Sequence, residues 1–352
     1  MAWFAANARD LPWRRTTDPY AICISEIMLQ QTRVQTAIGY YERFLKRFPT
    51  VEKLARARLD TVLKHWEGLG YYSRARNLHR AAKDIVARFN GRVPQTTPEL
   101  LSLPGIGAYT AGAIASIAFD QREPIVDGNI ERVLCRVFRI RENPKDTAVR
   151  KRIWSIAEDL LPRRRVGHFN QALMELGSEI CTPRNPRCED CPLRRVCGAR
   201  LHGEQNSLPV RSAKKPLPRH SVVVGIIYKE DRILIDKRKP QGLLGGLWEF
   251  PGGKVRTGES LEAALRREVR EELAIRIRVR RPLTIVDHTY SHFHVRIHAF
   301  ECTHVSGRPQ CITCDDVKWV RLQDLGRYAF PTANNKIIRV LRPPGKRTTR
   351  GK

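Results

Sequence analysis

The sequence has no hydrophobic run that approaches the ~20 apolar residues of a transmembrane helix. Its first fifteen residues lack the apolar core of a secretory signal peptide, and no internal repeat is visible. We therefore expect a cytoplasmic protein that has no membrane partner.

Acidic residues are also scarce. The chain has 36 Asp and Glu against 64 Lys and Arg, which gives a formal net charge of +28. Such an excess indicates a polyanionic partner, and nucleic acid is the commonest one for a folded protein. On charge alone, an arginine-rich protein with no nucleic-acid function is the alternative. The 352 residues, 41% of them hydrophobic, are enough for two ordinary cores.

The two halves of the chain differ in pattern. Helical periodicity dominates the first half and predicts a helix over 19–29, with Asp18 as its cap and Pro19 in its first turn. Further helices are predicted over 34–48, 51–66, 74–89 and 148–161. The second half favours strands at 221–228, 232–235 and 295–300 around a helix at 259–273. We expect four regions: a helical domain (1–200), a linker (201–218), an α+β domain (219–340) and a basic tail (341–352).

Four of the nine cysteines lie within seventeen residues. Cys181, Cys188, Cys191 and Cys197 follow the spacing C-x6-C-x2-C-x5-C. In a reducing compartment this crowding indicates metal binding rather than disulfides. Four thiolates suit either zinc or an iron–sulfur cluster, although zinc sites usually present two C-x2-C pairs and this loop has one.

A glycine-containing turn precedes a helix of small residues. Residues 103–110 read LPGIGAYT, and Gly105 and Gly107 permit a turn whose following N–H groups can bind a DNA phosphate. Taken alone, this is also an ordinary loop between helices. The sequence VDGN at 126–129 follows about twenty residues later. Together the two segments resemble the helix-hairpin-helix superfamily of base-excision glycosylases.

That resemblance implies that Asp127 is the essential aspartate. Endonuclease III-type members have a lysine nucleophile after the hairpin, where this chain has Tyr109. Without the lysine, no Schiff base with the sugar is expected. The chain therefore resembles the monofunctional adenine glycosylases of the MutY family, which also implies a place for Asn129 in the catalytic site.

Glu26 stands in the segment SEIMLQQT at 25–32. A single glutamate on a helix is more often a surface residue. The stretch 18–32 has almost no other charge, however, so we expect burial to raise its pKa and keep it protonated, as a general acid requires. The segment also resembles the MutY motif in which this glutamate is catalytic.

The MutY resemblance implies a chemistry as well as a pocket. Glu26 would protonate N7 of adenine, and an ionised Asp127 would stabilise the oxocarbenium-like sugar, directly or through a short-lived covalent bond. Leu29 and Gln31 match residues that enter the base stack when adenine is extruded. The implied DNA-contacting residues are Arg9, Trp13, Arg14, Leu29, Gln30, Gln31, Gly105, Gly107 and Gln171. The implied partner is duplex DNA with adenine opposite 8-oxoguanine or guanine, acted on by a monomeric, nucleoid-associated enzyme.

The 6-2-5 cysteine spacing is that of the [4Fe–4S] loop in the endonuclease III and MutY group. The resemblance thus implies that Cys181, Cys188, Cys191 and Cys197 bind a [4Fe–4S] cluster. The loop would present basic side chains to the phosphate backbone, namely Arg184, Arg187, Arg194 and Arg195.

Residues 253–275 resemble the Nudix box, with Ala274 in place of its last glycine. Glu268, Glu271 and Glu272 share one helical face, which could hold Mg2+ beside a diphosphate. The fold class expected is therefore multidomain: an all-α helix-hairpin-helix glycosylase domain with a [4Fe–4S] loop, followed by an α+β Nudix-like domain.

The segment HTYSHFH at 288–294 resembles the family's Phe-Ser-His loop that reads 8-oxoguanine. By this resemblance Tyr290 would stack on the lesion, and Ser291 and His292 would hydrogen-bond to it.

Two other functions stay open. The protein could be a Nudix hydrolase of 8-oxo-dGTP, alone or combined with the glycosylase, or a DNA-binding sensor without catalysis, against which Glu26 and Asp127 argue. A zinc site formed by Cys302, His304, Cys311 and Cys314 also stays open.

Overall fold

The computed structural model describes residues 1–212 and 216–341. Contacts divide the chain into two compact units, Met1–Ala57 with Asn77–Lys214 and Arg58–Arg76 with Lys215–Lys352. Residues 213–215 of the expected linker and 342–352 of the expected tail lie outside the described residues. No helix among the described residues is long and apolar enough to cross a membrane.

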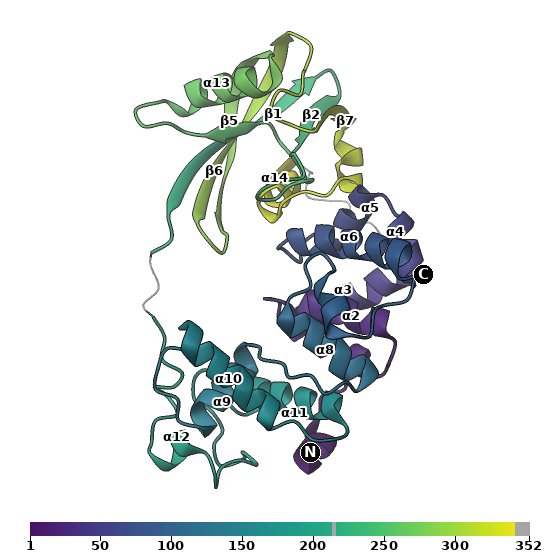
Figure 1. The fold of residues 1–352 in the computed structure, drawn as a ribbon. Helices are drawn as coiled ribbons and strands as arrows, with labels where there is room; N and C mark the ends of the chain where they lie inside the picture. The colour runs from purple at the N-terminus through teal and green to yellow at the C-terminus, as the bar shows by residue number, and fades with distance from the viewer. Residues whose placement is uncertain (213–215, 342–352) are drawn as a thin grey trace. The chain divides into compact units, whose positions relative to one another are not determined.

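Residues 1–212 form helices and no strand (Figure 1). The predicted helices are present, with one correction below. Their bounds are α1 (Ala2–Asn7), η1 (Pro12–Arg14), α2 (Pro19–Leu29), α3 (Val34–Arg47), α4 (Val51–Arg56), α5 (Leu59–Trp66), α6 (Ser73–Arg88), α7 (Thr97–Leu101), α8 (Ala108–Phe119), α9 (Gly128–Val137), α10 (Thr147–Asp159), α11 (Val166–Glu179) and α12 (Gly198–Leu201).

The single helix predicted over 51–66 is wrong, because α4 and α5 are separate. Ala57 and Arg58 have extended backbone between them. The carbonyl of Ala57 accepts a hydrogen bond from Nε2 of the buried His79 at 2.9 Å. This tertiary hydrogen bond replaces the one that the carbonyl would accept in a continuous helix.

The hairpin between α7 and α8 depends on glycine at one position. Gly105 has φ +79°, and a Cβ atom there would lie 2.6 Å from Cβ of Asn77. Gly107 is the N-cap of α8, so the first N–H groups of that helix are not satisfied within it. The hairpin thus leaves backbone donors available to an anion.

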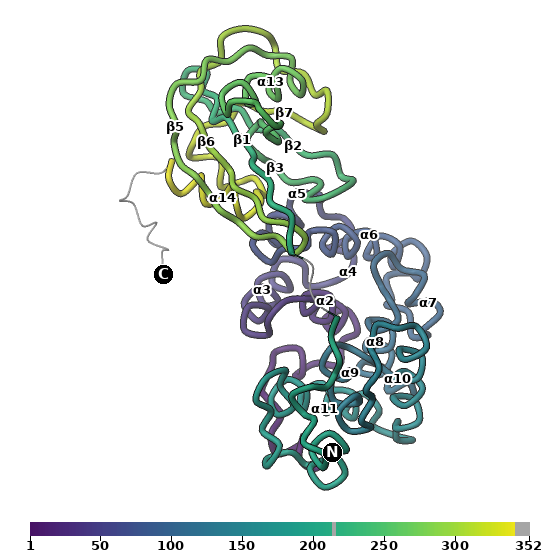
Figure 2. The backbone as a smooth tube through the Cα atoms, turned by 90° about the vertical axis from the view of Figure 1, so that its left-hand side faces the viewer, coloured from purple at the N-terminus to yellow at the C-terminus, as the bar shows by residue number. Residues whose placement is uncertain are grey.

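The second unit is a mixed seven-stranded sheet with a helix on each face (Figures 1 and 2). Strand order is β3-β2-β1-β6-β5, with β4 paired to β1 and β7 to β2; β1 and β6 run parallel. The apolar side of α13 packs on one face and that of α14 on the other. The bounds are β1 (Arg219–Lys229), β2 (Arg232–Lys237), β3 (Trp248–Glu249), β4 (Gly252–Lys254), α13 (Leu261–Leu273), β5 (Arg276–Thr289), β6 (His294–Ser306), β7 (Asp316–Arg321), η2 (Leu322–Arg327) and α14 (Thr332–Leu341).

Candidate active site

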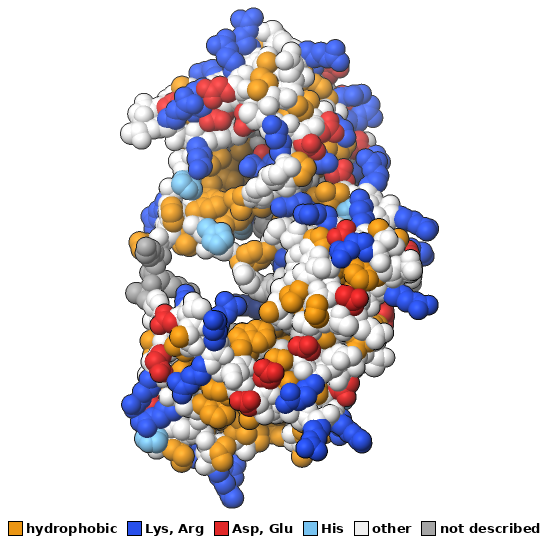
Figure 3. All heavy atoms as spheres, in the orientation of Figure 1, with side chains coloured by type: hydrophobic (Ala, Val, Ile, Leu, Met, Phe, Trp, Pro, Cys, Tyr) orange, Lys and Arg blue, Asp and Glu red, His pale blue; other side chains and the backbone are white. Residues whose placement is uncertain are grey.

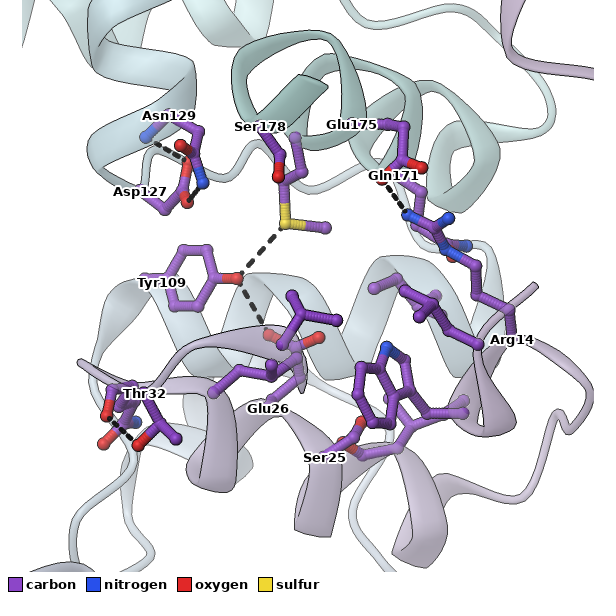
Figure 4. A pocket seen from close by; sticks show the side chains of 18 of the residues that line it. Arg14, Ser25, Glu26, Thr32, Tyr109, Asp127, Asn129, Gln171, Glu175 and Ser178 are labelled. Carbon is purple, nitrogen blue, oxygen red and sulfur yellow. Dashed lines mark hydrogen bonds and ion pairs between the residues drawn. The ribbon is translucent and has the colours of Figure 1, made fainter. Parts of the chain in front are cut away.

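One cavity of about 500 Å³ lies in the first unit (Figure 4). Its walls come from α2, α11, the N-terminal segment, and the residues around the starts of α8 and α9. It brings together most of the residues singled out in the sequence: Arg9, Trp13, Arg14, Glu26, Leu29, Gln30, Gln31, Tyr109, Asp127, Asn129 and Gln171.

Glu26 is buried at 4% exposure on α2, with its carboxylate in the cavity. The hydroxyl of Tyr109 donates to its Oε2 at 2.8 Å. Burial raises the pKa of Glu26 to about 7; the hydrogen bond from Tyr109 and the charge of Arg14 oppose that rise, and the charge of Asp127 adds to it. Near neutral pH this carboxyl can therefore hold a proton and release it, as a general acid must.

Asp127 is held at the start of α9 as its N-cap. Its Oδ1 accepts the N–H groups of Asn129 at 3.0 Å and Ile130 at 2.7 Å, and its Oδ2 accepts Nδ2 of Asn129 at 2.8 Å. Burial raises the pKa of Asp127, and these hydrogen bonds oppose the rise by favouring the ionised form. The cavity thus contains two carboxyl groups in different surroundings.

The C-terminal end of α2 forms the rim of the cavity. Nε2 of Gln30 donates to the hydroxyl of Thr110 at 3.0 Å, which fixes Gln30 against α8. Gln31 is exposed and has φ +55°, in the left-handed region that costs energy for a residue with a side chain. Leu29 and Gln31 therefore line the cavity at a strained turn.

Sequence reasoning missed Glu175 on α11. Its side chain is fully buried and accepts hydrogen bonds from Arg9 and Arg14 at 2.7–2.9 Å. Burial alone would raise the pKa of Glu175, but these hydrogen bonds outweigh it and lower the pKa to about 2. A signal was present, because Glu175 is a carboxylate one helical turn from Gln171 in an otherwise apolar segment.

The four cysteines line a pocket of their own, with Arg136, Arg194 and Arg200 around it. Nη1 of Arg136 lies 3.2 Å from Sγ of Cys181. Across the described residues, no three His, Cys, Asp or Glu side chains are arranged to hold a single metal ion. Thiols spread around one pocket, with guanidinium groups nearby, fit an anionic cluster.

Arg132 connects the cysteine loop to the cavity. Its guanidinium donates to the carbonyl of Cys181 at 2.6 Å and to Oδ1 of Asn129 at 2.9 Å. Because Asn129 in turn donates to Asp127, a continuous hydrogen-bonded chain runs from the loop to the aspartate. No pattern in the sequence indicates this contact, which joins α9 to a loop 49 residues away.

The predicted lesion-reading loop is in the second unit, at the turn between β5 and β6. Tyr290 is half-buried, and its ring contacts those of His288 and Phe293 at centroid distances of 4.6 and 5.0 Å. Ser291 and His292 are exposed. The hydroxyl of Tyr71, a second residue that the sequence analysis missed, hydrogen-bonds that of Ser291.

The three Nudix-box glutamates do not all face the same surroundings. Arg267 pairs with Glu268 at 2.7 Å and with Glu271 at 3.2 Å. Glu272 points inward, where burial first and then the charges of Glu249 and Glu268 raise its pKa to about 7. Carboxylates are the donors that Mg2+ prefers, yet no three of them converge on one point among the described residues.

Three parts of the chain match known protein families. Residues 24–159 match the family described as HhH-GPD superfamily base excision DNA repair protein, 181–197 the iron-sulfur binding domain of endonuclease III, and 222–340 the NUDIX domain. A solved thermostable thymine-DNA glycosylase is 32% identical with TM-score 0.53, over 57% of this chain and 93% of that one. A trapped endonuclease III–DNA intermediate, 22% identical with TM-score 0.50 over 57% and 92%, has the same fold. The first unit is thus that of a base-excision DNA glycosylase, and its cysteine loop is a [4Fe–4S] site.

Curated relatives that match between 71% and 100% of this chain narrow the class further. Adenine DNA glycosylase of Homo sapiens is 35% identical over 97% of this chain and 72% of its own length, and that of Rattus norvegicus 34% over 100% and 78%. The enzyme of Buchnera aphidicola is 38% identical over 71% and 72%. The chain belongs to the adenine DNA glycosylase family.

Proposed function

We propose that this protein excises adenine from duplex DNA by hydrolysing its N-glycosidic bond. The observation that carries the proposal is the pair of carboxyl groups in one cavity: Glu26, protonated near neutral pH by burial, and Asp127, held by three hydrogen bonds at the start of α9. A cavity of about 500 Å³ is large enough to take an extruded purine.

Each carboxyl has one task in this reaction. Glu26 gives its proton to N7 of adenine, so that the C1′–N9 bond can break and its electron pair leave with a neutral base. Asp127 stays ionised and stabilises the oxocarbenium-like sugar. Water then bonds to C1′ and returns a proton to Glu26, which leaves an abasic site.

We propose that the enzyme is monofunctional. Tyr109 stands where a lyase lysine would be, and its hydroxyl is engaged by Glu26 at 2.8 Å. A phenol cannot form a Schiff base with C1′, so no β-elimination of the strand follows.

DNA binding rests on three basic or donor-rich features. These are the α7–α8 hairpin, the arginines of the cysteine loop, and the net charge of +28. Lys and Arg side chains are spread over both units on the face that Figure 3 shows. We propose a monomer that acts at the nucleoid.

The preferred mispair follows from the β5–β6 turn. We propose that Tyr290, Ser291 and His292 read 8-oxoguanine opposite the adenine, because this turn presents an aromatic ring with two exposed polar side chains. Each good hydrogen bond to a base edge supplies about 1–3 kcal/mol of discrimination.

One observation favours nucleotide hydrolysis as a second function. Asp236 is 5% exposed, and its Oδ1 accepts no hydrogen bond from the described residues. Burial raises the pKa of Asp236 most, and the negative charges of Glu249 and Glu272 raise it further. Arg238 is the cation paired with Glu249, at 2.7 Å. Three carboxyl groups around one guanidinium repel one another, and Mg2+ would reduce that repulsion if it drew them together. We therefore expect Mg2+ to raise the melting temperature of wild type more than that of Glu272→Gln. Equal shifts would remove this candidate.

The main proposal is tested by single-turnover excision of adenine opposite 8-oxoguanine, G, C and T. Wild type should act on the first two, and Glu26→Gln should bind the same duplex but lose excision by orders of magnitude. Near-normal excision by Glu26→Gln would sink the assignment.

A further inference from the structure

The reaction described above gives no role to Glu175, although this residue lines the same cavity. Its carboxylate is wholly enclosed and accepts four hydrogen bonds: from the backbone N of Arg9 at 2.8 Å, from Nε and Nη2 of Arg9 at 2.9 and 2.7 Å, and from Nη2 of Arg14 at 2.8 Å. Figure 4 shows Arg14 and Glu175 facing one another across from Asp127. A buried carboxylate with this many charged donors is a fixed centre of negative charge.

Arg14 and Glu26 line the same cavity, and the positive charge of Arg14 favours the ionised form of Glu26, which opposes part of the effect of burial. The strength of that influence depends on whether Arg14 is neutralised. Glu175 supplies the neutralising charge, and Nη1 of Arg14 also donates to the carbonyl of Arg9 at 3.0 Å, so the guanidinium cannot swing toward Glu26 without breaking both contacts.

We propose that Glu175 is a positioning residue for the glycosylase reaction: by holding Arg14 in an ion pair, it withholds that positive charge from Glu26 and preserves the acid form of the catalytic carboxyl. The inference rests on the proposed role of Glu26. The other titratable groups that face Glu26 are Tyr109 on α8, Asp127 at the start of α9 and Cys23 on α2. None of these three is bonded to Glu175, so the ion pair can be changed without touching them.

The test is the pH dependence of the single-turnover excision rate. In Glu175→Gln the charge of Arg14 is no longer balanced, so Glu26 ionises at lower pH and the basic limb moves down by about half a pH unit or more. That shift corresponds to roughly threefold less activity on the basic side, with recovery at lower pH. A structural defect alone would lower the rate equally at every pH.

Glu179→Gln is the matched control. Glu179 pairs with the same Arg9, at 2.7 Å, but it is 36% exposed and lies outside the cavity. Its profile should coincide with that of wild type. Arg14→Gln should shift the basic limb in the opposite direction, to higher pH, because it removes the cation. This variant also tests the inference if Glu175→Gln does not fold.

A Glu175→Gln profile that coincides with wild type or moves up overturns the inference, and so does an Arg14→Gln profile that is unshifted or moves down. Glu26→Gln separates the two proposals. If that variant keeps turnover and the basic limb, the role of Glu26 fails; if it abolishes both while Glu175→Gln leaves the limb in place, only the role of Glu175 fails.

Discussion

Two glutamates in the walls of the cavity, on α2 and α11, differ in protonation state because their hydrogen-bond donors differ. Glu26 and Glu175 are both buried, yet their pKa values are about 7 and about 2. Burial opposes the charged form of each. Glu26 has a single phenol as its hydrogen-bond donor, whereas Glu175 has two guanidinium groups. The first is therefore suited to donate a proton and the second to stay charged.

The phenol gives the first prediction. The hydrogen bond from Tyr109 lowers the pKa of Glu26, so Tyr109→Phe should raise it and move the basic limb of the excision profile to higher pH. The measurement is the single-turnover rate from about pH 5 to about pH 9. A downward shift would show that the hydroxyl acts otherwise than through Glu26.

The burial of Glu26 was predictable, because the stretch around it lacks other charges. The state of Glu175 was not, because its partners Arg9 and Arg14 lie 166 and 161 residues away in the chain. A sequence pattern shows that a carboxylate sits among apolar residues, but only the fold shows which cations meet it.

At the scale of elements, α9 and its N-cap give the second prediction. Asp127 both caps the helix and supplies the charge for the reaction. Asp127→Asn keeps an acceptor for the N–H groups, whereas Asp127→Ala does not, so the alanine variant should lose about 1 kcal/mol more of the free energy of unfolding. Both should lose excision by orders of magnitude. Urea denaturation and single-turnover assays measure the two effects; an asparagine variant with near-normal excision would contradict the role of the charge.

The third prediction concerns the cysteine loop and its iron content. Purified protein should be brown, absorb broadly near about 400 nm, and contain about four irons per chain. Replacing Cys188 with Ser removes one thiolate from the pocket and should lower the iron content and the affinity for DNA together, because the loop arginines lose their support. A colourless protein with one zinc and full activity would refute the assignment.

Some elements escaped the sequence analysis for physical reasons. The break between α4 and α5 has neither proline nor glycine, and it is stabilised by His79 from another helix. Strand β5 begins RIRVRR, and its arginines lie on the exposed side of an edge strand, where charge replaces the usual apolar pattern. The helices with clear caps were predictable: the side chain of Asp18 accepts the N–H of Tyr20 at the start of α2.

At the scale of the whole molecule, the proposed functions assign excision to the cavity of the first unit and choice of the opposite base to the β5–β6 turn of the second, which a double variant can test. Ser291→Ala combined with His292→Ala should still remove adenine, but it should lose about thirtyfold or more of its preference for 8-oxoguanine over guanine, since about 1–3 kcal/mol is lost with each of the two hydrogen bonds. The measurement is the ratio of single-turnover rates on the two duplexes.

The matched control replaces Glu268, Glu271 and Glu272 with Gln on α13, which serves any hydrolysis rather than base readout. Its preference should equal that of wild type. If the triple variant loses the preference and the double variant keeps it, the lesion-reading turn has been placed wrongly.

The membership of Arg58–Arg76 in the second unit bears on how the protein is made. Oε1 of Glu67 accepts the N–H of Phe330 at 2.9 Å, from 263 residues further along the chain, and Asp60 pairs with Lys237 at 2.7 Å. A ribosome adds about 5–20 residues per second, so this segment waits on the order of ten to fifty seconds for its partners. During that time Glu67 and Asp60 lack these partners. The second unit, which joins this early segment to the C-terminal part of the chain, therefore cannot be completed until its last strand and helix have been translated.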